Sequence, residues 1–175
     1  TVAPGNYTVS ANKGVGLTGS TTPSVTVANG QNVTANICLA GVPVLAPTTA
    51  TLVSESCLPA NGVIDPGETV TVAFGVNNIG GANTVNDIGT LQPTGGATSP
   101  SGSQNYGVVV AGGPAISRNF TFTASPVLAC GANITATVQH QDGAANLGSL
   151  TYTLPTGAVG GAPTTTSYTG PPVAV

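Results

Sequence analysis

Apolar and polar residues alternate along most of the chain with a period of two, which is the spacing of a strand with one buried face. The clearest run is Thr69–Asn77, where Val and Phe alternate with Thr, Ala and Gly. Clusters of Gly, Pro, Asn and Ser separate this run from others of similar length. The pattern therefore predicts an all-β protein.

Seven such runs lie between residues 50 and 155, a number and spacing typical of an Ig-like antiparallel β-sandwich. In each run the apolar residues are expected to face a shared core, with Thr on the opposite face. The predicted strands are Ala50–Ser56, Thr69–Asn77, Val85–Gln92, Gln104–Val110, Ile116–Ala124, Asn133–Gln141 and Leu147–Leu154. The predicted core residues are Val70, Val72, Phe74, Val76, Phe120, Phe122, Ile134, Val138, Leu150, Tyr152 and Leu154.

Residues 1–42 alternate in the same way and predict three more strands, with an Asn-Gly hairpin turn at Ala28–Gln31. Three strands cannot close a sandwich, so we expect a smaller, incomplete β domain with an uncovered apolar face. Residues 43–49 contain two prolines and are expected to form a stiff linker. The apolar positions of the incomplete domain are Tyr7, Val9, Val25, Val27, Val33, Ile37 and Leu39.

The last stretch, residues 156–175, is rich in Gly and Thr and ends in SYTGPPVAV. A terminal segment of this kind is commonly disordered, but its Thr, Tyr and Val residues favour extended structure. Such a segment can add a strand to an exposed sheet edge of a neighbour, or fold back onto its own chain. The candidate donor residues are Thr164, Tyr168, Val173 and Val175.

Three of the five acidic residues lie in the stretch ESCLPANGVIDPGETVTV, residues 55–72. Clustered carboxylates repel one another unless a cation or hydrogen bonds compensate. Calcium binds carboxylate, amide and carbonyl oxygens, so the stretch predicts a Ca²⁺ site, although it lacks the ligand spacing of an EF-hand. The alternative is a solvated turn without a ligand. The candidate ligands are Glu55, Asn61, Asp65 and Glu68, with Asp87 and Asp142 as possible further ligands.

Two family resemblances involve these segments. The first resemblance involves four segments: NGVIDPGETVTV, NNIGGANT, FTFTA and a Cys-Gly followed by ITATV. They resemble Ig-like β-sandwich modules at the C-terminal ends of secreted bacterial proteins, including gingipain-type peptidases. That resemblance implies a non-catalytic spacer or binding domain, often with calcium. The segments APGNYTVSA and PSVTVANGQNVTANICL resemble the closing half of a carboxypeptidase-regulatory-like or Cna-B-type module, whose opening strands are absent.

The composition restricts the possible functions and location of the chain. Only 4% of the residues are charged, and Lys13 and Arg118 are the two cations, so there is no basic surface for nucleic acid. No apolar run is long enough to span a membrane. A surface of Thr, Ser, Asn and Gly without charge is unusual in the cytoplasm, and it favours a secreted, extracellular protein.

Three cysteines in a secreted chain suggest one disulfide and one remaining thiol. Cys57 and Cys130 lie beside turns of the same predicted sandwich, and we expect them to be bonded. The alternation of residues 33–39 places Cys38 on the polar face of its strand. Cys38 is therefore a candidate for an interdomain disulfide that displaces the first pairing, or for a bond to another chain.

No pattern of residues predicts catalysis. His140 is the one histidine, and Asp142 two positions later shares its strand face, but no nucleophile accompanies them. A residue at the end of a strand is usually solvated, so we expect that the chain is not an enzyme.

Two functions remain. The first is a structural subunit of an extracellular filament or pilus, stabilised by calcium and assembled head to tail from copies of itself. The second is a non-catalytic spacer or binding module of a larger secreted enzyme or adhesin.

Overall fold

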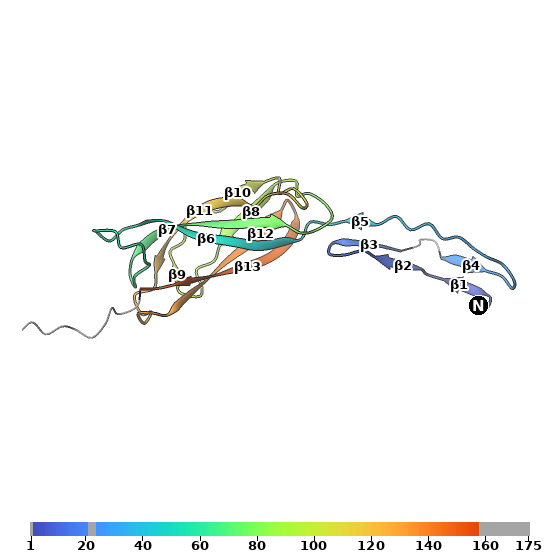
Figure 1. Cartoon of the computed structure of the whole chain (residues 1–175), viewed down its shortest axis with the longest axis horizontal. Coiled ribbons are helices and arrows are strands. Elements are labelled where there is room, and N and C mark those ends of the chain that lie inside the picture. The colour runs from blue at the N-terminus through green and yellow to red at the C-terminus, as the bar shows by residue number, and fades with distance from the viewer. Residues whose placement is uncertain (1, 21–23, 158–175) are drawn as a thin grey trace, which may run out of the picture.

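The computed structural model describes residues 2–20 and 24–157 of the chain. These residues form β-strands and no helix, so the all-β class predicted from the sequence is confirmed. Figure 1 shows an elongated molecule, with a thin part made of β1 to β5 at one end and a thicker sandwich made of β6 to β13 at the other. Within the described ranges, no helix is long and apolar enough to cross a membrane.

The sandwich consists of two four-stranded antiparallel sheets, with strand orders β6-β7-β11-β9 and β10-β8-β12-β13. The strands of the first sheet are β6 (Leu45–Glu55), β7 (Thr69–Asn78), β11 (Ile116–Ala124) and β9 (Ala97–Thr98). Those of the second are β10 (Gln104–Gly107), β8 (Asp87–Leu91), β12 (Asn133–Asp142) and β13 (Ala145–Pro155). The predicted sandwich fold is thus confirmed.

The core lies between the two sheets and is built from alternate residues of the long strands. Phe74 and Tyr152, from opposite sheets, pack with their ring centroids 4.7 Å apart. The buried hydroxyls find acceptors, since Tyr152 donates to the carbonyl of Gly75 and Tyr106 to that of Phe74, each at 2.9 Å. All the core residues predicted from the alternation are buried, with exposed fractions of 9% or less.

The N-terminal part contains five short strands rather than the three predicted. β1 (Gly5–Tyr7) pairs with β4 (Val25–Val27) in a two-stranded sheet. β2 (Ser10–Asn12), β3 (Leu17–Ser20) and β5 (Ala40–Gly41) form a three-stranded sheet. No described side chain before Leu45 is buried. The strands of this part therefore have no core of their own.

The predicted hairpin around Ala28–Gln31 is wrong, although its turn forms. Gln31 donates to the carbonyl of Ala28, and Gly30 has the positive φ of 76° that the turn requires. The following residues, 33–39, form no strand, and β4 pairs with β1 instead. Alternation in the sequence gave these residues the right faces, because Ile37 and Leu39 are half-buried and Cys38 is exposed, but alternation alone supplies no partner strand.

The two parts are connected more closely than the predicted linker at residues 43–49 suggested. β6 begins at Leu45 rather than at Ala50, so three of the residues assigned to the linker, Leu45, Ala46 and Pro47, pair with β7. The buried side chain of Asn78 accepts hydrogen bonds from the backbone N–H groups of Val44 and Gly80, at 3.1 and 2.9 Å, and donates to the carbonyl of Ala82. These bonds fix the start of β6 against the loop that follows β7.

Candidate functional site

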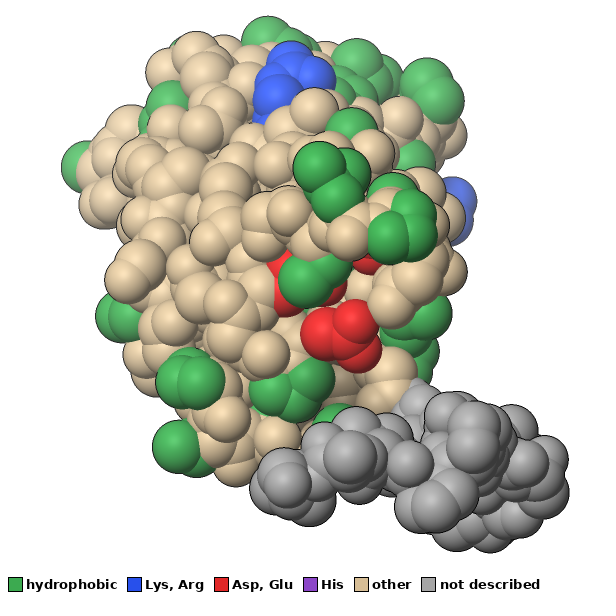
Figure 2. Space-filling model, turned by 90° about the vertical axis from the view of Figure 1, so that its left-hand side faces the viewer, with side chains coloured by type: hydrophobic (Ala, Val, Ile, Leu, Met, Phe, Trp, Pro, Cys, Tyr) green, Lys and Arg blue, Asp and Glu red, His purple; other side chains and the backbone are tan. Residues whose placement is uncertain are grey.

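The loop between β6 and β7 gathers four of the predicted ligand residues at the end of the sandwich far from the N-terminal part (Figure 1). Glu55 is the last residue of β6, and Glu68 directly precedes β7. Asn61 and Asp65 lie in the turns between them. Figure 2 looks onto this end of the molecule and shows acidic side chains close together on it.

Backbone N–H groups of the loop donate to the carboxylates. Glu68 is only 3% exposed and accepts from the N–H of Cys57 at 2.9 Å and from that of Asp65 at 3.0 Å. Glu55 accepts from the N–H of Gly62 at 2.8 Å. These bonds compensate part of the repulsion between the charges, and they hold the loop in place without requiring a cation.

Asn61 connects the loop to Asp65. Its side-chain amide donates to Asp65 Oδ2 at 2.9 Å, and its side-chain oxygen accepts from the N–H of Val63. After all these bonds, Glu55 Oε2 remains buried without a partner in the part of the chain that the structure describes. Among the described residues, no group of three or more His, Cys, Asp and Glu side chains is arranged to hold a metal ion. Calcium at this loop stays a prediction.

Asp87 and Asp142 lie at the other end of the sandwich. They are opposite each other on β8 and β12, and β12 begins near the acidic loop, because Ala132 bonds to Thr156 and Thr156 bridges to Ile64. With a rise of about 3.4 Å per residue, Asp142 is roughly 30 Å from the start of its strand. The two aspartates are therefore not ligands of an ion bound at the loop.

Asp142 accepts hydrogen bonds from two backbone N–H groups that precede β8. Its carboxylate receives the N–H of Val85 at 2.9 and 3.0 Å and that of Asn86 at 2.6 Å. The register shift beside His140 lies on β13, where Leu147 is the extra residue, and β12 keeps a regular register with β8, so His140 and Asp142 lie on the same face of the strand, as their spacing suggested.

His140 pairs with Asp87 inside the sandwich. The distance from His140 Nδ1 to Asp87 Oδ2 is 2.9 Å, and both side chains are 0% exposed. The expectation that His140 is solvated is wrong, because β12 continues the inward alternation of Ile134 and Val138 through residue 140. That alternation was visible in the sequence, whereas nothing in the sequence identified Asp87 as the partner.

An aromatic side chain packs against the pair. The ring of Tyr106 lies 5.2 Å from that of His140, measured between centroids. Burial, together with the negative charge of Asp87, raises the pKa of Tyr106 and of Tyr152 far above the usual range. His140 Nε2 and Asp87 Oδ1 have no hydrogen-bond partner among the described residues. The pair is thus a partly satisfied polar group in an apolar core.

The predicted Cys57–Cys130 disulfide is wrong, because both residues, like Cys38, are exposed thiols. The turn that carries Cys130 bonds to Gly157 through the N–H of Gly131, and Gly157 bonds in turn to Ile64. The end of β13 therefore connects the Cys130 turn to the loop of Cys57. The negative charge of Glu68 raises the pKa of the Cys57 thiol.

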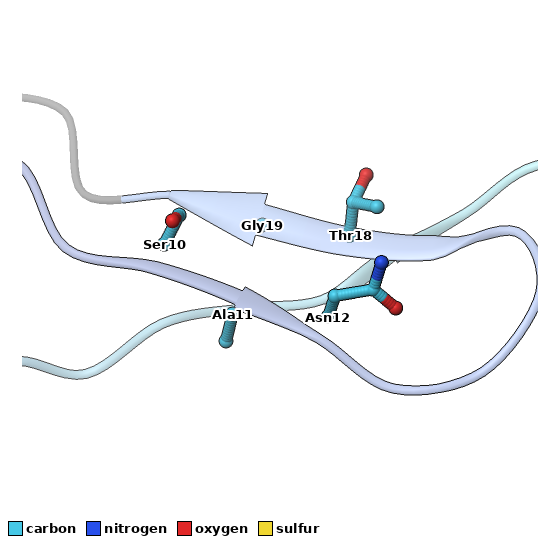
Figure 3. Close-up of a pocket in the computed structure, with 5 residues that line it drawn as sticks. All are labelled: Ser10, Ala11, Asn12, Thr18 and Gly19. Atoms are coloured by element: carbon cyan, nitrogen blue, oxygen red, sulfur yellow. The ribbon is translucent and has the colours of Figure 1, made fainter.

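A hollow on the N-terminal part lies along the β2–β3 hairpin. It is lined by Ser10, Ala11, Asn12, Thr18 and Gly19, and it contains no charged group. Figure 3 shows Ser10, Asn12 and Thr18 on one side of the hairpin and Ala11 on the other. Residues 37 and 38 approach the hairpin closely at Gly19, where a Cβ atom would meet the Cys38 carbonyl oxygen. Both polar and apolar groups line the hollow.

The predicted donor residues Thr164, Tyr168, Val173 and Val175 lie outside the described residues. The start of the predicted donor segment is corrected, because Thr156 is 5% exposed and belongs to the sandwich. Its N–H donates to the carbonyl of Ala132, and it forms a parallel bridge with Ile64. A segment that leaves this sandwich therefore begins after Gly157.

Comparison of the sequence with protein-family models and with curated proteins finds no match.

Proposed function

We propose that the chain is a structural subunit of an extracellular filament or pilus, in which residues 158–175 of one subunit complete the N-terminal strands of the next. The observation that carries this proposal is the absence of any buried side chain in the described residues before Leu45. Five strands without a fully buried side chain gain little hydrophobic stabilisation, and three or more strands normally need a covered apolar face to be stable. A partner is therefore needed to cover them.

The apolar residues of the N-terminal part are placed to receive such a partner. Tyr7, Val25 and Val27 are half-buried on the paired strands β1 and β4, where Gly5 lies opposite Val27 and Tyr7 opposite Val25. β2 is the edge of the three-stranded sheet and borders the hollow in Figure 3. A donated strand supplies backbone hydrogen bonds along an edge and apolar side chains for such a face.

The two ends of the molecule support head-to-tail assembly. In Figure 1 the N-terminal strands lie at one end of the long axis, and β13 runs toward the other. A contact between opposite ends of identical subunits is heterologous, and it propagates into a fibre because it does not close on itself. The sparse charge of the chain, 4% of residues, fits an extracellular location and close packing of subunits without electrostatic repulsion.

Calcium bound by Glu55, Asp65 and Glu68 is part of the proposal. The support is the buried Glu55 Oε2, which has no partner among the described residues, and the Asp65 carboxylate of the same loop, whose Oδ2 accepts from a neutral amide. A hard cation with oxygen ligands compensates such a cluster more fully than amide donors do. Its role here is to stabilise the loop at the end of the sandwich from which the donor segment leaves.

The second candidate function is a spacer or binding module of a larger secreted enzyme or adhesin, of Ig-like type. The observation that favours it is the complete core of the sandwich, which needs no other subunit. In that case further residues of the same polypeptide cover the N-terminal strands, and the purified chain is monodisperse.

Deletion of residues 158–175 separates the two functions. The intact chain is expected to form polymers on size-exclusion chromatography and fibres in negative-stain microscopy, and the chain ending at Gly157 is expected to form neither. The shortened chain must keep the melting temperature of its sandwich, which shows that the loss is one of assembly. Fibres from the shortened chain, or monodisperse particles from the intact one, would contradict strand donation.

A further inference from the structure

Strand β13 is a long edge of the second sheet, and no strand among the described residues pairs with its outer side. It spans Ala145–Pro155 and contains no charged residue. β6, the edge strand of the other sheet at the same margin of the sandwich, contacts β13 but forms no backbone ladder with it. The side chains of Ser149, Thr151 and Thr153 are exposed on the outer face, while Leu150 and Tyr152 between them are buried.

The hydrogen bonds of β12 show which groups of β13 point outward. The N–H of Thr135 donates to Gly95 and the carbonyl of Thr137 accepts from Gln92, both on the β8 side of β12. Opposite residues of an antiparallel pair alternate between bonded and non-bonded pairs. Thr153 and Thr151 lie opposite Thr135 and Thr137. Their own N–H and C=O groups therefore point away from β12, toward the open edge.

The other edges of the described sandwich are blocked. β6 carries Pro47 and two register shifts, and β9 is only two residues long. β10 has four residues and a register shift, and Arg118 Nε donates to the carbonyl of Asn105 on it at 2.6 Å. Proline, bulges, short length and a cation are the usual protections of an edge strand. Between Gly148 and Pro155, β13 has none of them.

We propose that β13 pairs antiparallel with β13 of a second copy of this chain, which joins two sheets into one continuous sheet across a two-fold axis. The residues of β13 themselves indicate that its partner is a second copy of the chain. A neutral edge meets its copy without repulsion, and an isologous contact requires each residue to suit its symmetry mate. The bonded ladder is limited by Gly148, which has a φ of 92° at a register shift, and by Pro155, which lacks an N–H. The axis therefore passes at Thr151.

This register places Thr151 opposite its copy and Ser149 opposite the partner's Thr153. The molecule already contains both kinds of pair between neighbouring strands. The hydroxyls of Thr71 and Thr121 lie 2.9 Å apart across β7 and β11, and those of Thr90 and Ser103 lie 2.8 Å apart across β8 and the residue before β10. Cross-strand hydroxyl pairs of this type stabilise an antiparallel ladder.

The lateral contact at β13 is separate from the proposed strand donation, which uses residues 158–175 and the N-terminal strands. Strand donation extends a filament along its axis, whereas pairing at β13 joins two subunits side by side. The pairing at β13 holds whether or not the chain forms fibres, so its experiment must report on β13 alone.

The experiment uses the full chain with the substitution T151C under a mild added oxidant. A disulfide between the two substituted positions necessarily links two chains, and peptide mapping by mass spectrometry separates it from links to Cys38, Cys57 or Cys130. We expect the self-linked peptide to be a major product. The matched control is T135C, which lies on the same outer face one strand inward and is also exposed. It is expected to give no self-linked peptide.

A second substitution tests the backbone ladder itself. T153P removes an N–H that β12 does not use, so the isolated fold keeps its own hydrogen bonds, as edge positions tolerate proline. In the T151C chain it is expected to abolish the self-linked peptide while the melting temperature stays within a few degrees. Absence of the link in T151C, an equal link in T135C, or a link unaffected by T153P would each overturn the pairing.

Discussion

His140 and Asp87 place two titratable side chains in a core of aromatic and branched residues. Burial of a charged or polar group costs several kcal/mol unless its partners compensate. Here one bond of 2.9 Å joins the pair, while His140 Nε2 and Asp87 Oδ1 have no partner among the described residues. The intact pair is therefore expected to stabilise the fold relative to a variant that keeps only one of the two side chains.

Removal of one partner is expected to cost far more than removal of both. D87L leaves the imidazole buried without its acceptor and H140L leaves the carboxylate buried without its donor, and each should lower the free energy of unfolding by about 3–5 kcal/mol. The double variant D87L/H140L replaces the pair with apolar groups and should lose less than either single variant. Urea denaturation of the four proteins measures this coupling. Additive losses would show that the two side chains act independently.

At the scale of the residue, prediction from the sequence succeeded where the burial of a side chain depends on one strand alone. The alternation in β7, β11 and β13 identified the buried residues, because side chains alternate faces along a strand whatever its partners are. It failed where two strands must meet. The Asp87–His140 contact joins residues that are 53 positions apart, and it depends on the register between β8 and β12. The same limitation led to the wrong disulfide between Cys57 and Cys130.

At the scale of the element, the loop between β6 and β7 behaves as a folded unit. Its sequence predicted the meeting of Glu55, Asn61, Asp65 and Glu68, because turns at Asn61-Gly62 and Asp65-Pro66-Gly67 bring the ends of two paired strands together. The sequence did not predict that loop N–H groups bond to Glu55 and Glu68. Proline content also misplaced the start of β6, since prolines at an edge strand are compatible with pairing on one side.

Calcium is expected to raise the melting temperature of the sandwich. An ion that binds only the folded protein adds RT ln(1 + [L]/Kd), about 2.7 kcal/mol at a hundred times Kd. Differential scanning calorimetry with added calcium and with EDTA measures the shift. E55Q should remove it because Glu55 carries the unpartnered oxygen, whereas D142N, at the other end, should keep it. A melting temperature that EDTA does not change would show that the loop is held by its hydrogen bonds alone.

At the scale of the whole molecule, a complete sandwich is joined to strands without a core. Hydrogen bonds cross the junction, because the N–H of Val44 donates to Asn78 and the N–H of Gly81 donates to the carbonyl of Val42 at 3.0 Å. The sequence predicted this contrast, since the three strands expected in residues 1–42 are too few to close a sandwich. It did not predict the pairing of β1 with β4, because the Asn-Gly turn favoured a hairpin with residues 33–39.

Strand donation is tested most directly by hydrogen–deuterium exchange on the chain ending at Gly157, with and without a synthetic peptide of residues 164–175. We predict that the peptide slows amide exchange in β1 to β5 and leaves the sandwich unchanged, because it completes the uncovered strands. A peptide of the same composition in scrambled order should have no effect. Unchanged exchange in residues 2–44 at saturating peptide, or protection confined to β13, would contradict the proposed assembly.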